Sequence, residues 1–204
     1  MALKMFSRRS WPLAPGMFGV VPLLLLAFSP RQHKELLVAR SADDPVLTMR
    51  IKALSPTVSP EEARRVTYCA VTTGLELARK WRVVGVATWL PGIQNLYVMM
   101  GARKGGYCFQ YSTELLLRLD ALKLQTLELH WAESGPHTMS ENNGIVVTAR
   151  GQPFEKGVLL DSWRCQPHLA WTQVSMDPEY RWKENKSFAA IVLRRANNEI
   201  LENR

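Results

Sequence analysis

Motifs that bind metals or nucleotides are missing from this sequence. It contains no C-x-x-C, no H-E-x-x-H and no paired-histidine spacing, and Cys165 with His168 supplies only half of a metal-ligand set. The glycine-rich patterns G-x-G-x-x-G and G-x-x-x-x-G-K-[ST], which cradle phosphates, are absent as well. We therefore expect no metal, no cofactor and no nucleotide chemistry.

Cysteine is scarce, with Cys69, Cys108 and Cys165 as the three in the chain. An odd number leaves one thiol unpaired in an oxidising compartment. Cys69 can pair with Cys165 while Cys108 stays free, but the other pairings, and no pairing at all, remain open.

Acidic residues are absent before Glu35, whereas Lys4, Arg8 and Arg9 precede an apolar run over residues 17–28. This is the layout of a secretory signal, and the run is too short for a comfortable membrane span. We expect an exported protein, periplasmic or anchored to the inner membrane. Residues 1–30 are then either a cleaved signal peptide or an uncleaved N-terminal anchor, and a buried helix of a cytosolic domain is the alternative.

The net charge of +8 favours anionic partners such as nucleic acid or phospholipid headgroups. The basic residues are scattered, however, and form no stripe along a predicted helix, so nucleic-acid binding ranks last among the expected functions. The length, with 47% hydrophobic and 22% charged residues, fits one domain plus appendages.

Residues 31–58 are polar and proline-containing, which predicts a linker, and residues 59–204 are expected to form the folded domain. A helix is predicted from Ser59 to about Trp81, because Ser59 can cap it and Pro60 suits its first turn. Helical spacing returns over 92–104 and again from Tyr107, where four leucines share one face. They are Leu115, Leu116, Leu119 and Leu122.

The hydrophobic period changes to two beyond residue 125. Residues 125–132, 144–151 and 157–164 predict three strands, and the glycines and proline of 150–157 suit a hairpin loop between the last two. The tail predicts one more strand or helix near 187–195. These patterns together predict an α+β fold, with helices packed on an antiparallel sheet.

Three residues of this pattern form a candidate catalytic set. Cys108 opens a helix, His130 lies on the polar face of the first strand, and Asp161 ends a later strand. A helix N-terminus stabilises a thiolate, an imidazole can take the thiol proton, and a carboxylate orients the imidazole. We expect Cys108 as nucleophile, His130 as base and Asp161 as the orienting acid.

The runs "GGYCFQYSTELLLRLDALKLQTLEL", "GIVVTARG" and "GVLLDSW" resemble the core of the transglutaminase-like superfamily of papain-related cysteine enzymes. The resemblance covers residues 105–163. It implies a papain-like cysteine core in which Cys108 corresponds to the nucleophile and Asp161 to the acid of the triad. The sequence departs from the family pattern where a histidine is expected, because Asn142 and Asn143 stand there. An asparagine amide cannot act as a general base.

His130 is the preferred replacement for the missing histidine, ahead of His137 on a predicted loop, and a lost base is the third alternative. Each residue also has a structural interpretation. Cys108 can be a buried packing residue, His130 a satisfied strand histidine, and Asp161 a strand-ending carboxylate paired with Arg164 or Lys156.

Two functions follow from these residues. The first is an exported thiol-dependent amide hydrolase or acyltransferase, whose substrate is a peptide, a protein or a cell-wall amide. The second is a catalytically degenerate transglutaminase-like domain that acts as a binding or scaffolding module. Three tryptophans near the predicted strands either line a binding cleft or pack in the core. They are Trp131, Trp163 and Trp171.

Overall fold

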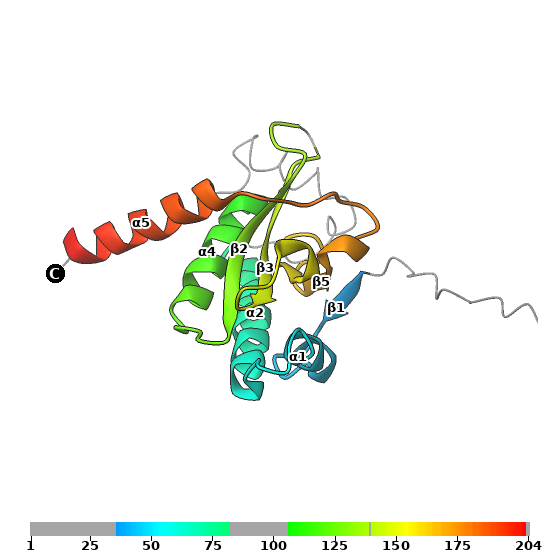
Figure 1. Ribbon diagram of the computed structural model, residues 1–204. Helices are drawn as coiled ribbons and strands as arrows, with labels where there is room; N and C mark the ends of the chain where they lie inside the picture. The colour runs from blue at the N-terminus through cyan, green and yellow to red at the C-terminus, as the bar shows by residue number, and fades with distance from the viewer. Residues whose placement is uncertain (1–35, 82–105, 139, 203–204) are drawn as a thin grey trace, which may run out of the picture. The chain divides into compact units, whose positions relative to one another are not determined.

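The computed structural model describes residues 36–81, 106–138 and 140–202, and it confirms an α+β fold with an antiparallel sheet (Figure 1). The six strands lie in the order β1-β5-β4-β3-β2-β6, and every neighbouring pair is antiparallel. Their bounds are β1 Leu37–Ala39, β2 Leu127–Ser134, β3 Asn142–Ala149, β4 Val158–Asp161, β5 Leu169–Gln173 and β6 Lys183–Glu184. The hairpin predicted over 150–157 is present, and the first two predicted strands pair with each other as β2 and β3.

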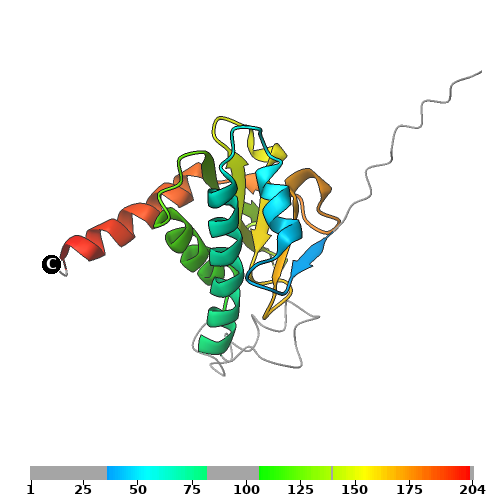
Figure 2. The same cartoon turned by 90° about the horizontal axis from the view of Figure 1, so that it is seen from below.

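The described α-helices are α1 Pro45–Lys52, α2 Pro60–Lys80, α4 Cys108–Asp120 and α5 Lys186–Glu202. Figures 1 and 2 show α2 and α4 side by side against one face of the sheet. The main core lies between these two helices and the sheet, where Leu115, Leu119 and Ile145 are fully buried. The leucine face predicted for the helix after Tyr107 is therefore the buried face of α4.

The opposite face of the sheet carries a second, smaller core. It contains Ala132, Val146, Phe154, Leu159, Val174 and Trp182. Two short 3₁₀ segments, Phe154–Lys156 and Val174–Met176, and the chain that leads into β6 contribute to this layer. Side chains on the two faces of β2 and β3 therefore have different surroundings, and this separation decides which site residues can meet.

Helix α2 begins as the sequence predicts. Ser59 has extended backbone angles, its hydroxyl accepts a hydrogen bond from the Glu62 N–H at 3.4 Å, and Pro60 stands at the first helical position. The helix ends in Arg79 and Lys80, whose charges complement the negative end of the helix dipole.

The predicted linker over 31–58 is wrong for residues 37–52. Strand β1 pairs with β5, and helix α1 places Leu47 and Ile51, both fully buried, in the main core. The prolines at 56 and 60 separate two packed helices and do not mark a domain boundary. The folded domain therefore includes residues that the sequence assigned to a connection.

Two predicted features lie outside the described residues. They are the signal or anchor segment of residues 1–30 and the helical spacing over 92–104. Among the residues that the structure does describe, no helix has the length and apolar character needed to cross a membrane.

Gly157 is expected to tolerate no side chain, although its backbone angles are those of ordinary extended residues. A Cβ there would clash with Val146 Cγ1 and lie 2.9 Å from Thr148 Cγ2. We expect Gly157→Ala to lower the free energy of unfolding by about 1–3 kcal/mol through overpacking. The measurement is urea denaturation.

Gly74→Ala is the matched control. Its Cβ would come no closer than 3.6 Å to an atom outside α2, the Pro167 carbonyl oxygen, so the better helix propensity of alanine should raise the free energy of unfolding by up to about 1 kcal/mol. Equal stability changes in the two variants would contradict the overpacking explanation.

Candidate functional site

Cys108 stands at the first position of α4, as the sequence predicts. The turn before it is held by the Gln110 side chain, whose Oε1 accepts hydrogen bonds from the N–H groups of Gly106 at 2.7 Å and Tyr107 at 3.0 Å. The indole N–H of Trp163 donates to the Gly106 carbonyl at 3.0 Å. These contacts hold the start of the helix in place, and with it the Cys108 side chain.

The Cys108 thiol is buried, with 4% of the residue exposed. It packs against Leu77, Tyr111 and Trp163. Burial raises the pKa of this thiol to about 11; the hydrogen bond from Asn143 works in the opposite direction, while the nearby carboxylates of Glu141 and Asp161 raise the pKa further. At neutral pH the group is a thiol and not a thiolate.

Asn143 is the side chain that contacts the thiol. Its Nδ2 donates to Cys108 Sγ at 3.4 Å and to Glu141 Oε1 at 3.2 Å, while its Oδ1 accepts the indole N–H of Trp131 at 3.1 Å. The Trp131 bond fixes which end of the amide faces sulfur. The thiol in turn lies 3.7 Å from the Glu141 carbonyl oxygen, to which it can donate. The polar contacts of sulfur thus include an amide and a carbonyl, and among the described residues no histidine contacts it.

Asp161 is fully buried at the end of β4, and four donors surround its carboxylate. Asn142 Nδ2 donates to Oδ2 at 2.7 Å, and Arg164 Nε donates to the same oxygen at 3.2 Å. The other oxygen accepts the backbone N–H groups of Trp163 and Arg164 at 2.9 and 3.0 Å. Of the partners that the sequence offered for Asp161, Arg164 is therefore the one found.

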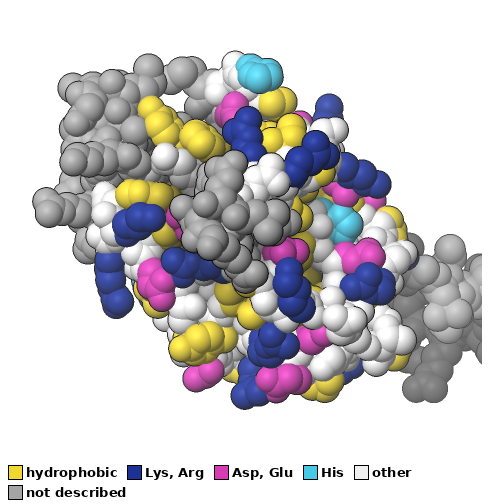
Figure 3. Space-filling view, turned by 90° about the vertical axis from the view of Figure 1, so that its left-hand side faces the viewer, with side chains coloured by type: hydrophobic (Ala, Val, Ile, Leu, Met, Phe, Trp, Pro, Cys, Tyr) yellow, Lys and Arg dark blue, Asp and Glu magenta, His cyan; other side chains and the backbone are white. Residues whose placement is uncertain are grey.

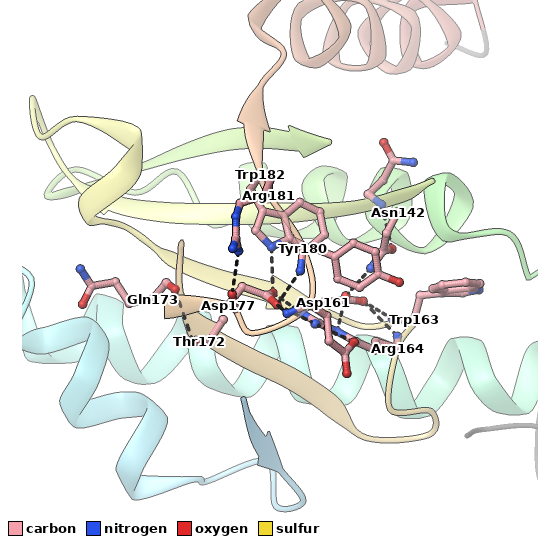
Figure 4. A network of polar contacts seen from close by, with 12 residues as sticks. Asn142, Asp161, Trp163, Arg164, Thr172, Gln173, Asp177, Tyr180, Arg181 and Trp182 are labelled. Carbon is pink, nitrogen blue, oxygen red and sulfur yellow. Dashed lines mark hydrogen bonds and ion pairs between the residues drawn. The ribbon is translucent and has the colours of Figure 1, made fainter. Parts of the chain in front are cut away.

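Arg164 links Asp161 to Asp177, as Figure 4 shows. Its two terminal nitrogens donate to the two Asp177 oxygens at 2.7 and 3.1 Å, and its guanidinium lies 4.9 Å from the centre of the Tyr180 ring. Trp182 Nε1 also donates to Asp177 at 2.8 Å. Burial acts to raise the pKa of Asp177, but the bonds from Arg164 and Trp182 outweigh it and the pKa is lowered.

The prediction that His130 serves as the base for Cys108 is wrong in its geometry. His130 Nδ1 lies 2.7 Å from Glu184 Oε1, and Nε2 lies 2.9 Å from Thr148 Oγ1, so both ring nitrogens are occupied. Successive strand residues point to opposite faces, and the next residue, Trp131, is the one that reaches Asn143. His130 instead faces the smaller core and packs edge-on against Phe154.

His137 lies on the turn between β2 and β3 with a positive φ of 65°. Its backbone N–H donates to Glu141 Oε2 at 2.8 Å, and no described contact joins its ring to Cys108. The structure therefore brings together Cys108, the Asn142–Asn143 pair and Asp161 around the start of β3, and it places both candidate replacement histidines elsewhere.

The structure also bears on the cysteine pairings and on the three tryptophans. The three cysteines are unpaired. Trp131, Trp163 and Trp171 are buried, so the cleft alternative for them is wrong, and two of them orient the groups beside the thiol. Within the described part of the chain, no group of three His, Cys, Asp or Glu side chains has the arrangement of a metal site.

Sequence reasoning missed Asn143 as the partner of the thiol and Asp177 as the second anchor of Arg164. The asparagine pair was visible in the sequence, but the alternation of side chains along the strand did not reveal which of the two faces sulfur.

No family model matches this chain, and no curated protein or solved structure matches it either.

Proposed function

We propose that this protein acts by binding, through a transglutaminase-like arrangement whose thiol stays protonated. The observation that carries the proposal is the neighbourhood of Cys108 Sγ, where the Asn143 amide and the Glu141 carbonyl occupy the positions that a base would need. Neither group can accept a thiol proton and hold it as a base does.

The electrostatics support the same proposal. A nucleophilic cysteine needs a thiolate, which a cationic neighbour and an accessible helix N-terminus stabilise. Cys108 has the helix N-terminus, but it is buried, and the charged groups that act on it are the carboxylates of Glu141 and Asp161. Among the described residues, the cation of this network is Arg164, and it is engaged by Asp161 and Asp177.

A thiol-dependent amide hydrolase or acyltransferase is the second candidate. Two observations favour it. Cys108 stands at a helix N-terminus, and Asp161 accepts a hydrogen bond from residue 142, as the acid of a Cys-His-Asp triad does from its histidine. Such an enzyme would need a base from outside these contacts. Its substrate would be a peptide, a protein or a cell-wall amide.

The place of action is part of the proposal for both candidates. The basic residues followed by an apolar run in the first 30 residues support export, to the periplasm or to the inner membrane through an N-terminal anchor. A binding module so placed would meet peptides, proteins and cell-wall amides, which are the partner classes that either candidate implies.

The reactivity of the Cys108 thiol tests the proposal. In a chain carrying Cys69→Ser and Cys165→Ser, we expect iodoacetamide at pH 8 to alkylate Cys108 on the order of a hundredfold more slowly than free cysteine. The rate should keep rising about tenfold per pH unit up to pH 10, because the thiol has its pKa near 11. Mass spectrometry of quenched samples gives the rate.

The same chain unfolded in urea is the control, and it should react like free cysteine. A rate in the folded protein that is already constant between pH 6 and pH 8 would mean that Cys108 is a thiolate at neutral pH. That result would overturn the binding proposal and support the enzyme.

A further inference from the structure

One side of strand β2 is only partly covered. Strand β6 pairs with β2 at Ala132 and Glu133, and the Asn185 N–H adds a bond to the Trp131 carbonyl at 2.9 Å. The chain then turns into α5. In the described part of the protein, residues 127–130 of β2 have β3 on one side and no strand on the other.

The register identifies the backbone groups that face this open side. The Arg150 N–H donates to the Thr126 carbonyl at 2.9 Å, so the even-numbered residues of β2 exchange hydrogen bonds with β3. The N–H and C=O groups of Leu127 and Leu129 therefore point away from β3. No described group pairs with them, and such a row of donors and acceptors is a template for another strand.

A groove of about 460 Å³, lined by five leucines and six polar or charged residues, runs beside this open edge. The end of α4, the turn into β2, Arg150 and the second turn of α5 line it. Its leucines are Leu119, Leu124, Leu127, Leu129 and Leu193. Figure 1 shows α5 leaving the body of the protein at this edge. The groove thus places leucine side chains, with charged residues among them, beside a row of backbone hydrogen-bonding groups.

The charges in the groove compensate each other. Lys123 Nζ lies 3.1 Å from Asp120 Oδ2, and Arg150 Nη1 lies 3.6 Å from Glu128 Oε1. In Figure 3, Lys and Arg side chains are interspersed with Asp and Glu on the face shown. A groove without surplus charge does not select a phosphate or another anion. It suits a neutral occupant, such as a polypeptide backbone.

We propose that the open edge of β2 binds an extended segment of a partner protein, which adds to the sheet as a strand beside β2. Its backbone would pair with Leu127 and Leu129, and every second side chain, apolar, would enter the groove. Helix α5 projects outward from the body of the protein beside this edge (Figures 1 and 2). This inference is independent of the Cys108 thiol.

The probe for this proposal is an end-blocked, uncharged six-residue peptide of alternating valine and threonine. Titrated into the ¹⁵N-labelled full chain, it should shift the amide signals of Leu127 and Leu129 and slow their hydrogen exchange about tenfold. Two further peptides carry N-methyl groups on either the odd or the even residues. One of them should bind as the parent does and the other should not, because a strand presents only alternate N–H groups to its neighbour.

Leu129→Pro removes an N–H that points away from β3, so it should abolish binding while the sheet persists, and Leu129→Val is the control that keeps the N–H. The proposal is overturned if millimolar peptide leaves both amides unchanged, or if both methylated peptides bind equally. It is also overturned if Leu127 and Leu129 become protected at high protein concentration without peptide, since the occupant is then a second copy of the chain.

Discussion

Replacing Arg164 with alanine is expected to lower the free energy of unfolding by about 3–5 kcal/mol at pH 7. The guanidinium and the two carboxylates that it joins, Asp161 and Asp177, have side chains that are 4%, 0% and 0% exposed. Removing the cation leaves two buried negative charges without a counter-ion, and their remaining backbone and indole donors compensate only in part. Urea denaturation measures the loss.

Two controls separate this effect from the loss of any arginine. Arg118→Ala removes a surface arginine that pairs with Glu76 and Glu114, and it should cost no more than about 1 kcal/mol. Arg164→Lys keeps the positive charge but lacks the planar guanidinium that binds two oxygens at once, so its loss in free energy of unfolding should lie between those of the two alanine variants. A loss below about 1 kcal/mol for Arg164→Ala would contradict the proposed role of this cation.

The loss should also depend on pH. The pKa of Asp177 is lowered in the folded protein, so its ionised form contributes stability above the unfolded pKa of about 4, and that contribution is lost as the pH falls through the folded pKa. The difference between the native protein and Arg164→Ala should therefore be largest near pH 7 and shrink in acid. A difference that grows below pH 4 would contradict this sign.

Asn142→His is expected to raise the alkylation rate of Cys108 at pH 8 on the order of a hundredfold. The native Asn142 amide donates to Asp161 Oδ2 at 2.7 Å, and a ring N–H at this position can donate to the same oxygen. The residues on either side, Glu141 and Asn143, both contact Cys108 Sγ. The prediction requires that a histidine ring at this strand end reach sulfur as well as Asp161; it would then provide the base and, once protonated, the cation that the thiolate lacks.

Asn142→Gln is the matched control, because it adds volume without a titratable group, and it should leave the slow alkylation unchanged. The double variant Asn142→His with Cys108→Ser should show no reaction at this site. If Asn142→His folds, as circular dichroism can establish, and Cys108 still reacts at the native rate, then residue 142 is not the position of a missing base.

Local patterns identified the elements that their own residues specify. The cap at Ser59 and Pro60 predicted the start of α2, and the leucine spacing after Cys108 predicted the buried face of α4. Glu62 shows where such reasoning ends. Its place in the first turn of α2 suits the helix dipole, but its carboxylate also accepts the N–H groups of Gln125 and Thr126, more than sixty residues away.

The elements that the sequence missed are short or depend on distant partners. Strand β1 is three residues long and β6 is two, so neither carries a periodic pattern, and each exists because β5 or β2 offers it an edge. Strand β5 and helix α1 likewise depend on distant partners, because β5 pairs with β4 and α1 packs into the main core.

The sequence by itself determined the α+β class, the hairpin between β3 and β4, the position of Cys108 at a helix start and the position of Asp161 at a strand end. Only the tertiary structure decided that His130 faces away from the thiol and that Asn143 faces toward it. It also decided that Arg164 joins Asp161 to Asp177. The physical reason is that periodicity fixes which residues share a face, whereas the layer packed on each face comes from distant parts of the chain.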